Sequence, residues 1–243
     1  MLAHSPRIVT DGLVLCLDAA NTKSYPGSGT TWTDLSGRGN NGTLVNGVGY
    51  SGDNLGSLSF DGVDDYVNLG ASSNLTGDNL QTLTLSQWIY PLPDSGVPGT
   101  TFVVKRVDNS SLFRTAINTA QSTNALGDYI GFLTRNNANT GGSFLTVSIT
   151  PYLNTWVNLA ITIDGMSRKL YINGNLEGSD SDQGMQSVVG SSAMSSIGAF
   201  FLDTSSDISN KYPGRVAHTL FYRIALTAQE IQQNFNALKS RYQ

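Results

Sequence analysis

Residues 156–174 read WVNLAITIDGMSRKLYING, and this stretch decides the fold class. From Val157 to Ile163, apolar residues alternate with Asn, Ala and Thr, which is the two-residue period of a strand with one buried face. Asp-Gly at 164–165 and Asn-Gly at 173–174 then supply residues suited to tight hairpin turns. The stretch therefore predicts consecutive antiparallel strands with no helix between them.

Short runs of the same kind recur along the chain, separated by Gly, Asn, Asp and Ser. Asp61-Gly62 marks a further hairpin between two of these runs. About a dozen strands without interleaved helices predict an all-β protein, with two antiparallel sheets packed as a sandwich. The expected strands are Leu13–Asp18, Ser57–Phe60, Tyr66–Leu69, Leu83–Tyr90, Thr101–Val107, Leu112–Ile117, Tyr129–Thr134, Phe144–Thr150, Trp156–Ile163, Lys169–Ile172, Ser195–Phe200 and Val216–Tyr222.

A short helix is predicted near the C-terminus. Thr227 can cap its first turn, and the side chain of Glu230 can reach back to the backbone, so that the two form a capping box. Apolar residues then follow on one face, at Ile231, Phe235 and Leu238. We expect this face to pack on the sandwich in a structural role.

The segment from Thr22 to Tyr50 is rich in Gly, Asn, Ser and Thr and is predicted to be a long loop that covers the sandwich. Three of its apolar residues are expected to be buried: Trp32, Leu35 and Leu44. No change of composition divides the rest of the chain. We therefore expect residues 1–11 to form a tail and residues 12–243 to form one domain.

Composition excludes several classes of partner. The chain has 243 residues, of which 39% are apolar and 13% charged, and its formal net charge is −4. It has no basic stripe, so we expect no nucleic-acid partner.

Its single cysteine, Cys16, lies in an apolar run and is expected to be buried and unreactive. No apolar run reaches the roughly 18 residues of a membrane span, and the N-terminus does not read as a secretory signal.

Seven motifs follow one another along the chain, among them FDGVDDYV at 60–67, WVNLA at 156–160 and LYING at 170–174. The others lie at Gly12–Asp18, Trp32–Leu44, Leu83–Trp88 and Ala225–Ile231. In this order they resemble the motifs of laminin-G-like and pentraxin domains, which are concanavalin A-like jelly-roll sandwiches. Asn158 stands where the family usually has His. The resemblance implies the jelly-roll fold, but lectins, adhesion modules, glucanases and coat components all use that fold.

The opening of the chain also resembles structural proteins of tailed bacteriophages. This resemblance implies a first hypothesis, a non-enzymatic structural or decoration protein of a virus particle, on the capsid or the tail. It would be assembled in the host cytoplasm, contact other virion proteins and aid adhesion to the host surface. A second hypothesis is a lectin-like module that binds cell-surface glycans with the assistance of calcium. A third is a glycoside hydrolase.

A glycoside hydrolase needs two carboxylates about 5–10 Å apart, one as the acid and one as the base or nucleophile. The chain has only two glutamates, Glu177 in a hairpin and Glu230 in the helix cap. Asp64 and Asp65 straddle a hairpin, so we expect their side chains to diverge. We therefore expect no catalytic residues and no enzymatic activity. The two histidines are not expected to act as bases either: His4 and His218.

Calcium requires six to eight oxygen ligands, and two acidic groups are candidates. The first, at 61–65, is interpreted as turn-forming residues of a hairpin: Asp61, Asp64 and Asp65. The resemblance to pentraxins implies the second, because Asp108-Asn109 matches the pair that ligates calcium there. Phe200 and Phe201 stand where that family has further acids. Half of the set is missing, which leaves a single weak calcium ion or a simple turn at 108–109. The candidate ligands are Asp108, Asn109, Asp203 and Asp207, and we expect no other cofactor.

Glycan-binding modules present aromatic rings and polar groups to sugars. The tryptophans match positions that the family buries, so all three are expected in the core: Trp32, Trp88 and Trp156. The segment 200–212 reads FFLDTSSDISNKY, and its two adjacent phenylalanines cannot both face inward on a strand. We therefore predict a ligand-binding rim made of Asp108, Asn109, Phe200, Phe201, Asp203 and Tyr212.

Overall fold

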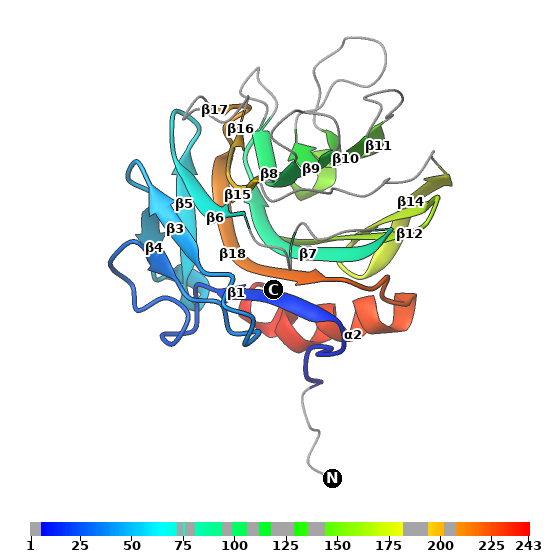
Figure 1. Ribbon diagram of the computed structural model, residues 1–243, viewed down its shortest axis with the longest axis horizontal. Coiled ribbons are helices and arrows are strands. Elements are labelled where there is room, and N and C mark those ends of the chain that lie inside the picture. The colour runs from blue at the N-terminus through cyan, green and yellow to red at the C-terminus, as the bar shows by residue number, and fades with distance from the viewer. Residues whose placement is uncertain are drawn as a thin grey trace.

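The computed structural model describes residues 6–71, 75, 81–93, 99–105, 112–117, 129–135, 144–181, 194–201 and 208–243. Two antiparallel sheets lie face to face, and a helix covers the outer side of one of them (Figure 1). The predicted fold class is confirmed, as an all-β jelly-roll sandwich with a short C-terminal helix. No helix of the described residues is both long and apolar enough to cross a membrane.

The first sheet runs, in spatial order, through β14 (Asn175–Ser181), β13 (Ser167–Ile172), β12 (Val157–Asp164), β7 (Thr82–Pro91), β18 (Pro213–Tyr222), β5 (Ser57–Asp61) and β4 (Gly49–Ser51), and β1 (Leu13–Asp18) also pairs with β18. The second sheet runs through β11 (Phe144–Ser148), β10 (Tyr129–Arg135), β9 (Leu112–Ile117), β8 (Gly99–Lys105), β15 (Met194–Ile197), β6 (Tyr66–Gly70), β3 (Gly42–Val45) and β2 (Thr31–Trp32). A separate pair joins β16 (Phe200–Phe201) to β17 (Ile208–Ser209).

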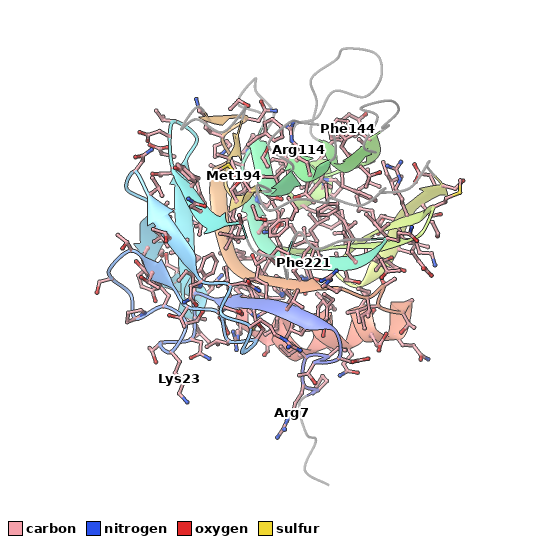
Figure 2. All side chains as sticks on the ribbon, viewed as in Figure 1. Arg7, Lys23, Arg114, Phe144, Met194 and Phe221 are labelled. Carbon is pink, nitrogen blue, oxygen red and sulfur yellow. The ribbon has the colours of Figure 1, made fainter. Side chains whose placement is uncertain are left out.

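The main core lies between the two sheets. Alternate residues of each strand point into it, because successive side chains of a strand leave on opposite faces. Phe102 of the second sheet stacks on Phe221 of the first, with 5.5 Å between ring centroids, and Phe113 packs edge-on against Phe102. Each such fully buried ring stabilises the fold by about 1.5–3 kcal/mol relative to its exposed state. Phe221 is labelled in the interior in Figure 2.

A second apolar layer lies outside the first sheet, beneath α2 (Ala228–Leu238). Trp88 on β7 is fully buried there, and its ring stacks at 4.4 Å on Tyr242 and at 5.7 Å on Phe235. Trp156 packs against the same Tyr242 ring. The tryptophans are buried as predicted, but these two lie under the helix and not between the sheets, whereas Trp32 does belong to the main core.

The helix forms as its sequence predicts. The Thr227 hydroxyl accepts from the Glu230 N–H, and the Glu230 carboxylate accepts from the Thr227 N–H, so the capping box is confirmed. Its predicted apolar face is buried against the first sheet: Ile231, Phe235 and Leu238. The helix is followed by a short 3₁₀ turn, η3 (Lys239–Arg241), which carries the chain back over β1. Two further 3₁₀ turns are η1 (Asp53–Leu55) and η2 (Thr150–Tyr152).

The predicted hairpin turns are also confirmed. Gly62 and Gly165 adopt φ values of +78° and +58° after their aspartates. Asn173 and Gly174 both have positive φ, as the two-residue turn between β13 and β14 requires. The turn is tied to the sheet, because Asn158 N–H donates to the Asn173 side chain and Asn173 N–H donates to the Asn158 carbonyl.

The prediction of a covering loop over 22–50 is wrong. This segment contributes β2, β3 and the start of β4, which pair with strands of both sheets. The strands are two to four residues long, so their period could not be distinguished from that of a turn-rich segment. Trp32 and Leu44 are buried as expected, but Leu35 is 37% exposed.

Candidate functional site

The predicted rim is described only in part. The four candidate calcium ligands lie outside the described residues, as does the side chain of Phe201, so their roles stay predictions: Asp108, Asn109, Asp203 and Asp207. The register of β15 on β8 pairs Met194 with Lys105 and Ser196 with Val103. The segment after Gly198 therefore leaves β15 at the end opposite to that where the chain passes from β8 toward Asp108. The two halves of the rim start at different ends of one strand.

Phe200 faces away from the main core. Val103 alternates with the core residues Phe102 and Val104, and Leu133 follows the core residue Phe132, so both point to the outer side of the second sheet. Phe200 packs on them there together with Phe144 of β11, and both phenylalanine side chains are half-buried. We call this group, completed by Arg114, the Phe200 face: Val103, Arg114, Leu133, Phe144 and Phe200.

Arg114 gives the Phe200 face its charge. Its guanidinium carbon lies 5.1 Å from the centroid of the Phe200 ring, which is within cation–π distance. Figure 2 labels Arg114 and Phe144 at the side of the molecule opposite α2. Sequence reasoning missed Arg114 and Phe144. The signal for Arg114 was its position next to the core residue Phe113, which turns an arginine to the outer face of a strand.

Tyr212 does not belong to an exposed rim. Its side chain is fully buried, its ring lies 6.1 Å from that of Phe60, and its hydroxyl donates to the carbonyl of Tyr90 at 3.0 Å. Burial raises the pKa of this phenol above its ordinary value. The aromatic ring supports the sandwich from inside and cannot stack on a ligand.

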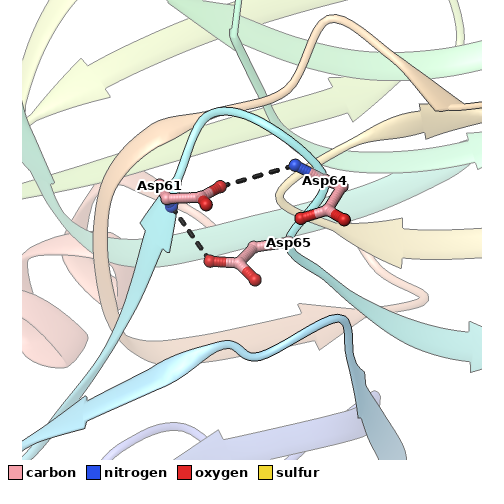
Figure 3. Close-up of side chains that lie close together, drawn as sticks. All are labelled: Asp61, Asp64 and Asp65. Atoms are coloured by element: carbon pink, nitrogen blue, oxygen red, sulfur yellow. Dashed lines mark hydrogen bonds between the residues drawn. The ribbon is translucent and has the colours of Figure 1, made fainter.

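The three aspartates of the β5–β6 hairpin come together, contrary to the predicted divergence. One carboxylate oxygen from each of Asp61, Asp64 and Asp65 lies within 4.8 Å of the others (Figure 3). Asp61 Oδ1 accepts from the N–H groups of Val63 and Asp64, and Asp65 Oδ2 accepts from Asp61 N–H at 3.0 Å. These backbone bonds fold the turn back on itself, which brings side chains from both strands to one place.

A cavity of about 690 Å³ opens between β1, the residues before it, and the end of α2. At its base, Asp18 Oδ2 accepts from Arg241 Nη1 at 2.8 Å and lies 4.0 Å from His218 Nε2. Burial lowers the pKa of His218 to about 4, although the Asp18 carboxylate opposes this shift. Burial, followed by the nearby Asp18 and Asp34, raises the pKa of the Cys16 thiol to about 12.

Cys16 and His218, the two groups of this cavity that could act as nucleophile and base, are neutral and unreactive. At neutral pH the thiol of Cys16 is protonated and the imidazole of His218 is uncharged, so they do not form a thiolate–imidazolium pair. The Asp18–His218 separation of 4.0 Å is too long for a hydrogen bond. Asp18 is instead held by Arg241 and by the N–H of Ala20. These contacts fasten the C-terminal turn to β1.

The fold and these surfaces define a lectin-like sandwich. The chain belongs to the concanavalin A-like lectin/glucanases superfamily, since residues 61–232 match the Laminin_G_3 family model. A search of curated proteins finds no match.

Solved structures of similar fold include toxin binding domains. The binding domain of botulinum neurotoxin serotype D has a TM-score of 0.65 and 14% identity, over 93% of this chain and 52% of that one. The binding domain of Paraclostridial Mosquitocidal Protein 1 has a TM-score of 0.66 and 17% identity, over 93% and 51%. The chain thus spans about half the length of these domains, and at such identities the likeness concerns the fold alone.

Proposed function

We propose that this chain is a non-catalytic, lectin-like adhesion module that binds glycans with its Phe200 face. The observation that supports the proposal is the pairing of a half-buried phenylalanine with an arginine, 9% exposed, on the outer side of a sheet in a lectin-type fold. A flat apolar ring beside a cationic donor suits a sugar, which has apolar C–H faces and a rim of hydroxyl groups. Phe144 extends the same surface along the edge strand β11.

The carboxylates support a binding role over hydrolysis. Within the described residues, Glu230 is engaged in the helix cap and Glu177 lies on the exposed strand β14. The aspartates that do converge, at 61–65, use oxygens of Asp61 and Asp65 to accept backbone N–H groups of their own hairpin. A glycosidase needs one free acid and one free base or nucleophile on opposite sides of a substrate bond.

A glycan array tests the proposal. Wild-type protein should bind a defined subset of glycans, and the Phe200→Ala variant should lose at least tenfold in affinity for them. Met166→Ala is the matched control, because Met166 is a large apolar side chain, 55% exposed, at the β12–β13 turn. Unchanged binding by Phe200→Ala would remove the Phe200 face from the proposal, and release of reducing sugars would point to hydrolysis instead. Repeating the array with EDTA tests whether calcium assists.

The second part of the proposal concerns the particle that carries this module. We propose that it decorates the capsid or tail of a bacteriophage, next to other virion proteins, where glycan binding aids adhesion to the host surface. The support is the resemblance of its opening motif, Gly12–Asp18, to phage structural proteins. Mass spectrometry of purified particles should find the chain at a fixed ratio to the capsid protein. If the chain is absent from the particles, the proposed phage location is wrong, and the glycan-binding proposal is unaffected.

A further inference from the structure

The β5–β6 hairpin gathers three negatively charged side chains at its turn. One carboxylate oxygen from each of Asp61, Asp64 and Asp65 lies within 4.8 Å of the others, at the turn that joins β5 to β6 (Figure 3). No lysine or arginine of the described residues forms an ion pair with any of them. Like charges at this distance repel, and turn formation alone does not require all three.

One oxygen of the group is buried and has no partner. Asp65 is only 5% exposed, and its Oδ1 receives no hydrogen bond from any part of the chain that the structure describes. A buried acceptor without a donor destabilises a fold by about 1–3 kcal/mol, and more if it is charged. Burial is also the main reason why the pKa of Asp65 is raised, and the neighbouring Asp61 and Asp64 add to it.

The neighbouring β3–β4 turn helps to enclose this oxygen. The Asn46 side chain donates to the Asp64 carbonyl at 3.0 Å, which fastens the two turns together. Gly47 follows, and a Cβ placed on it would lie 3.8 Å from Asp65 Oδ1. The turn therefore approaches Oδ1 at a residue that has no side chain.

We propose that Asp61, Asp64 and Asp65 form a binding site for a calcium ion. The free ligands are Asp65 Oδ1, the carboxylate of Asp64 and Asp61 Oδ2, because Asp61 Oδ1 and Asp65 Oδ2 are taken by backbone N–H groups. An all-oxygen set on a loop suits calcium, which accepts irregular geometry and completes its shell with water. Asp61 and Asp64 are exposed, so we expect a weak site with a Kd on the order of 10⁻⁴–10⁻³ M.

Thermal unfolding of the full chain, first stripped of metal, tests the site. About 10 mM CaCl₂ should raise the Tm by about 3–7 °C, since it binds the folded state alone. NaCl of equal ionic strength should not change the Tm, and MgCl₂ should change it less, because magnesium demands a stricter geometry. No shift with calcium, or an equal shift with magnesium, would contradict the proposal.

Two variants localise the ion. Asp64→Asn keeps the size of an exposed side chain and removes a ligand charge, so it should fold normally and lose at least tenfold in calcium affinity. Asp53→Asn is the matched control, since Asp53 is 79% exposed and lies outside the cluster. If calcium still raises the Tm of Asp64→Asn but no longer raises that of Asp108→Ala, the ion lies at the site predicted around Asp108, and the proposal for Asp61, Asp64 and Asp65 is wrong.

Terbium luminescence gives a second, local readout. Tyr66 follows Asp65 in the chain, so its ring can transfer excitation energy to Tb³⁺ held by the carboxylates. Wild-type protein should sensitise terbium, calcium should quench the signal by competition, and Asp64→Asn should abolish it. Neither readout involves glycans, so the calcium site and the proposed function succeed or fail separately.

Discussion

The outer faces of the two sheets differ in what covers them. Outside the first sheet, Trp88 is fully buried beneath α2 and η3, and the charged pair of Asp18 and Arg241 ties the chain end to β1. Outside the second sheet, Phe144 and Phe200 stay half-buried beside Arg114. The aromatic residues of the two outer faces therefore differ in burial. Those beneath α2 form a buried layer that holds the helix to the sheet, whereas Phe144 and Phe200 keep part of their surface exposed.

The largest expected effect is the loss of the covered aromatic ring. Trp88→Ala removes a fully buried side chain that stacks on both Phe235 and Tyr242, so the free energy of unfolding should fall by about 3–5 kcal/mol. Urea unfolding followed by far-UV circular dichroism measures it. In Trp88→Phe, which keeps an aromatic ring at this position, the free energy of unfolding should fall clearly less. A loss below about 1 kcal/mol for the alanine variant would show that α2 does not depend on this layer.

The second-largest expected effect on stability is that of pH, through His218. His218 has a pKa of about 4 in the folded protein, against an ordinary value of 6.5, because it is buried under the C-terminal turn. Between these values the unfolded chain binds the proton and the folded chain does not. The free energy of unfolding should therefore fall as the pH drops from 6.5 to 4, by up to about 3 kcal/mol, and stay level above pH 7.

Urea unfolding at a series of pH values measures this slope. His218→Gln should flatten it, because glutamine is similar in size to histidine and takes up no proton in this range. An unchanged slope in the variant would assign the pH dependence to other groups.

The third prediction concerns the N-terminal cap of α2, the helix that packs on the first sheet. Thr227→Ala removes the hydroxyl that accepts from Glu230 N–H, so stability should fall by about 1 kcal/mol. The reciprocal bond from Thr227 N–H to Glu230 remains. Differential scanning calorimetry should find a Tm lower by a few degrees, and Thr227→Ser should restore it. Glycan binding should not change in either variant, because the helix lies on the opposite side from the Phe200 face.

The smallest effect on stability is expected at the Phe200 face. Phe200→Ala removes a half-buried ring from the outer side of the second sheet, so the free energy of unfolding should fall by less than about 1 kcal/mol. The same urea assay measures it next to Trp88→Ala. A loss as large as that of Trp88→Ala would mean that Phe200 is a structural residue, and the distinction between the two faces would disappear.

The sequence predicts the strands well where their pattern is long enough to read. Leu13–Asp18 and Leu112–Ile117 are found with the predicted bounds, and the capping box at Thr227 forms as expected. The short strands within 22–50 were missed, because a strand of two to four residues has no measurable period. Their pairing is decided by tertiary contacts with β5 and β6.

The candidate sites were harder to predict, because they depend on which face a residue occupies. The sequence predicted that Phe200 and Phe201 do not both face inward without deciding between them, and Phe200 is the one found on the outer face, whereas Tyr212, also assigned to the rim, is fully buried. Asp64 and Asp65 were expected to diverge by strand alternation, which does not apply once the chain turns back at Gly62. The pairing of Arg114 with Phe200 joins residues from β9 and β16, and no local pattern contains it.

Mapping a bound glycan by NMR tests the central claim most directly. With a glycan selected on the array, amide shifts of the full chain should change most in β8, β9, β10 and around Phe200, while those of α2 stay in place. Shift changes centred on α2 and the Asp18–Arg241 cavity, with the second sheet unaffected, would contradict the account.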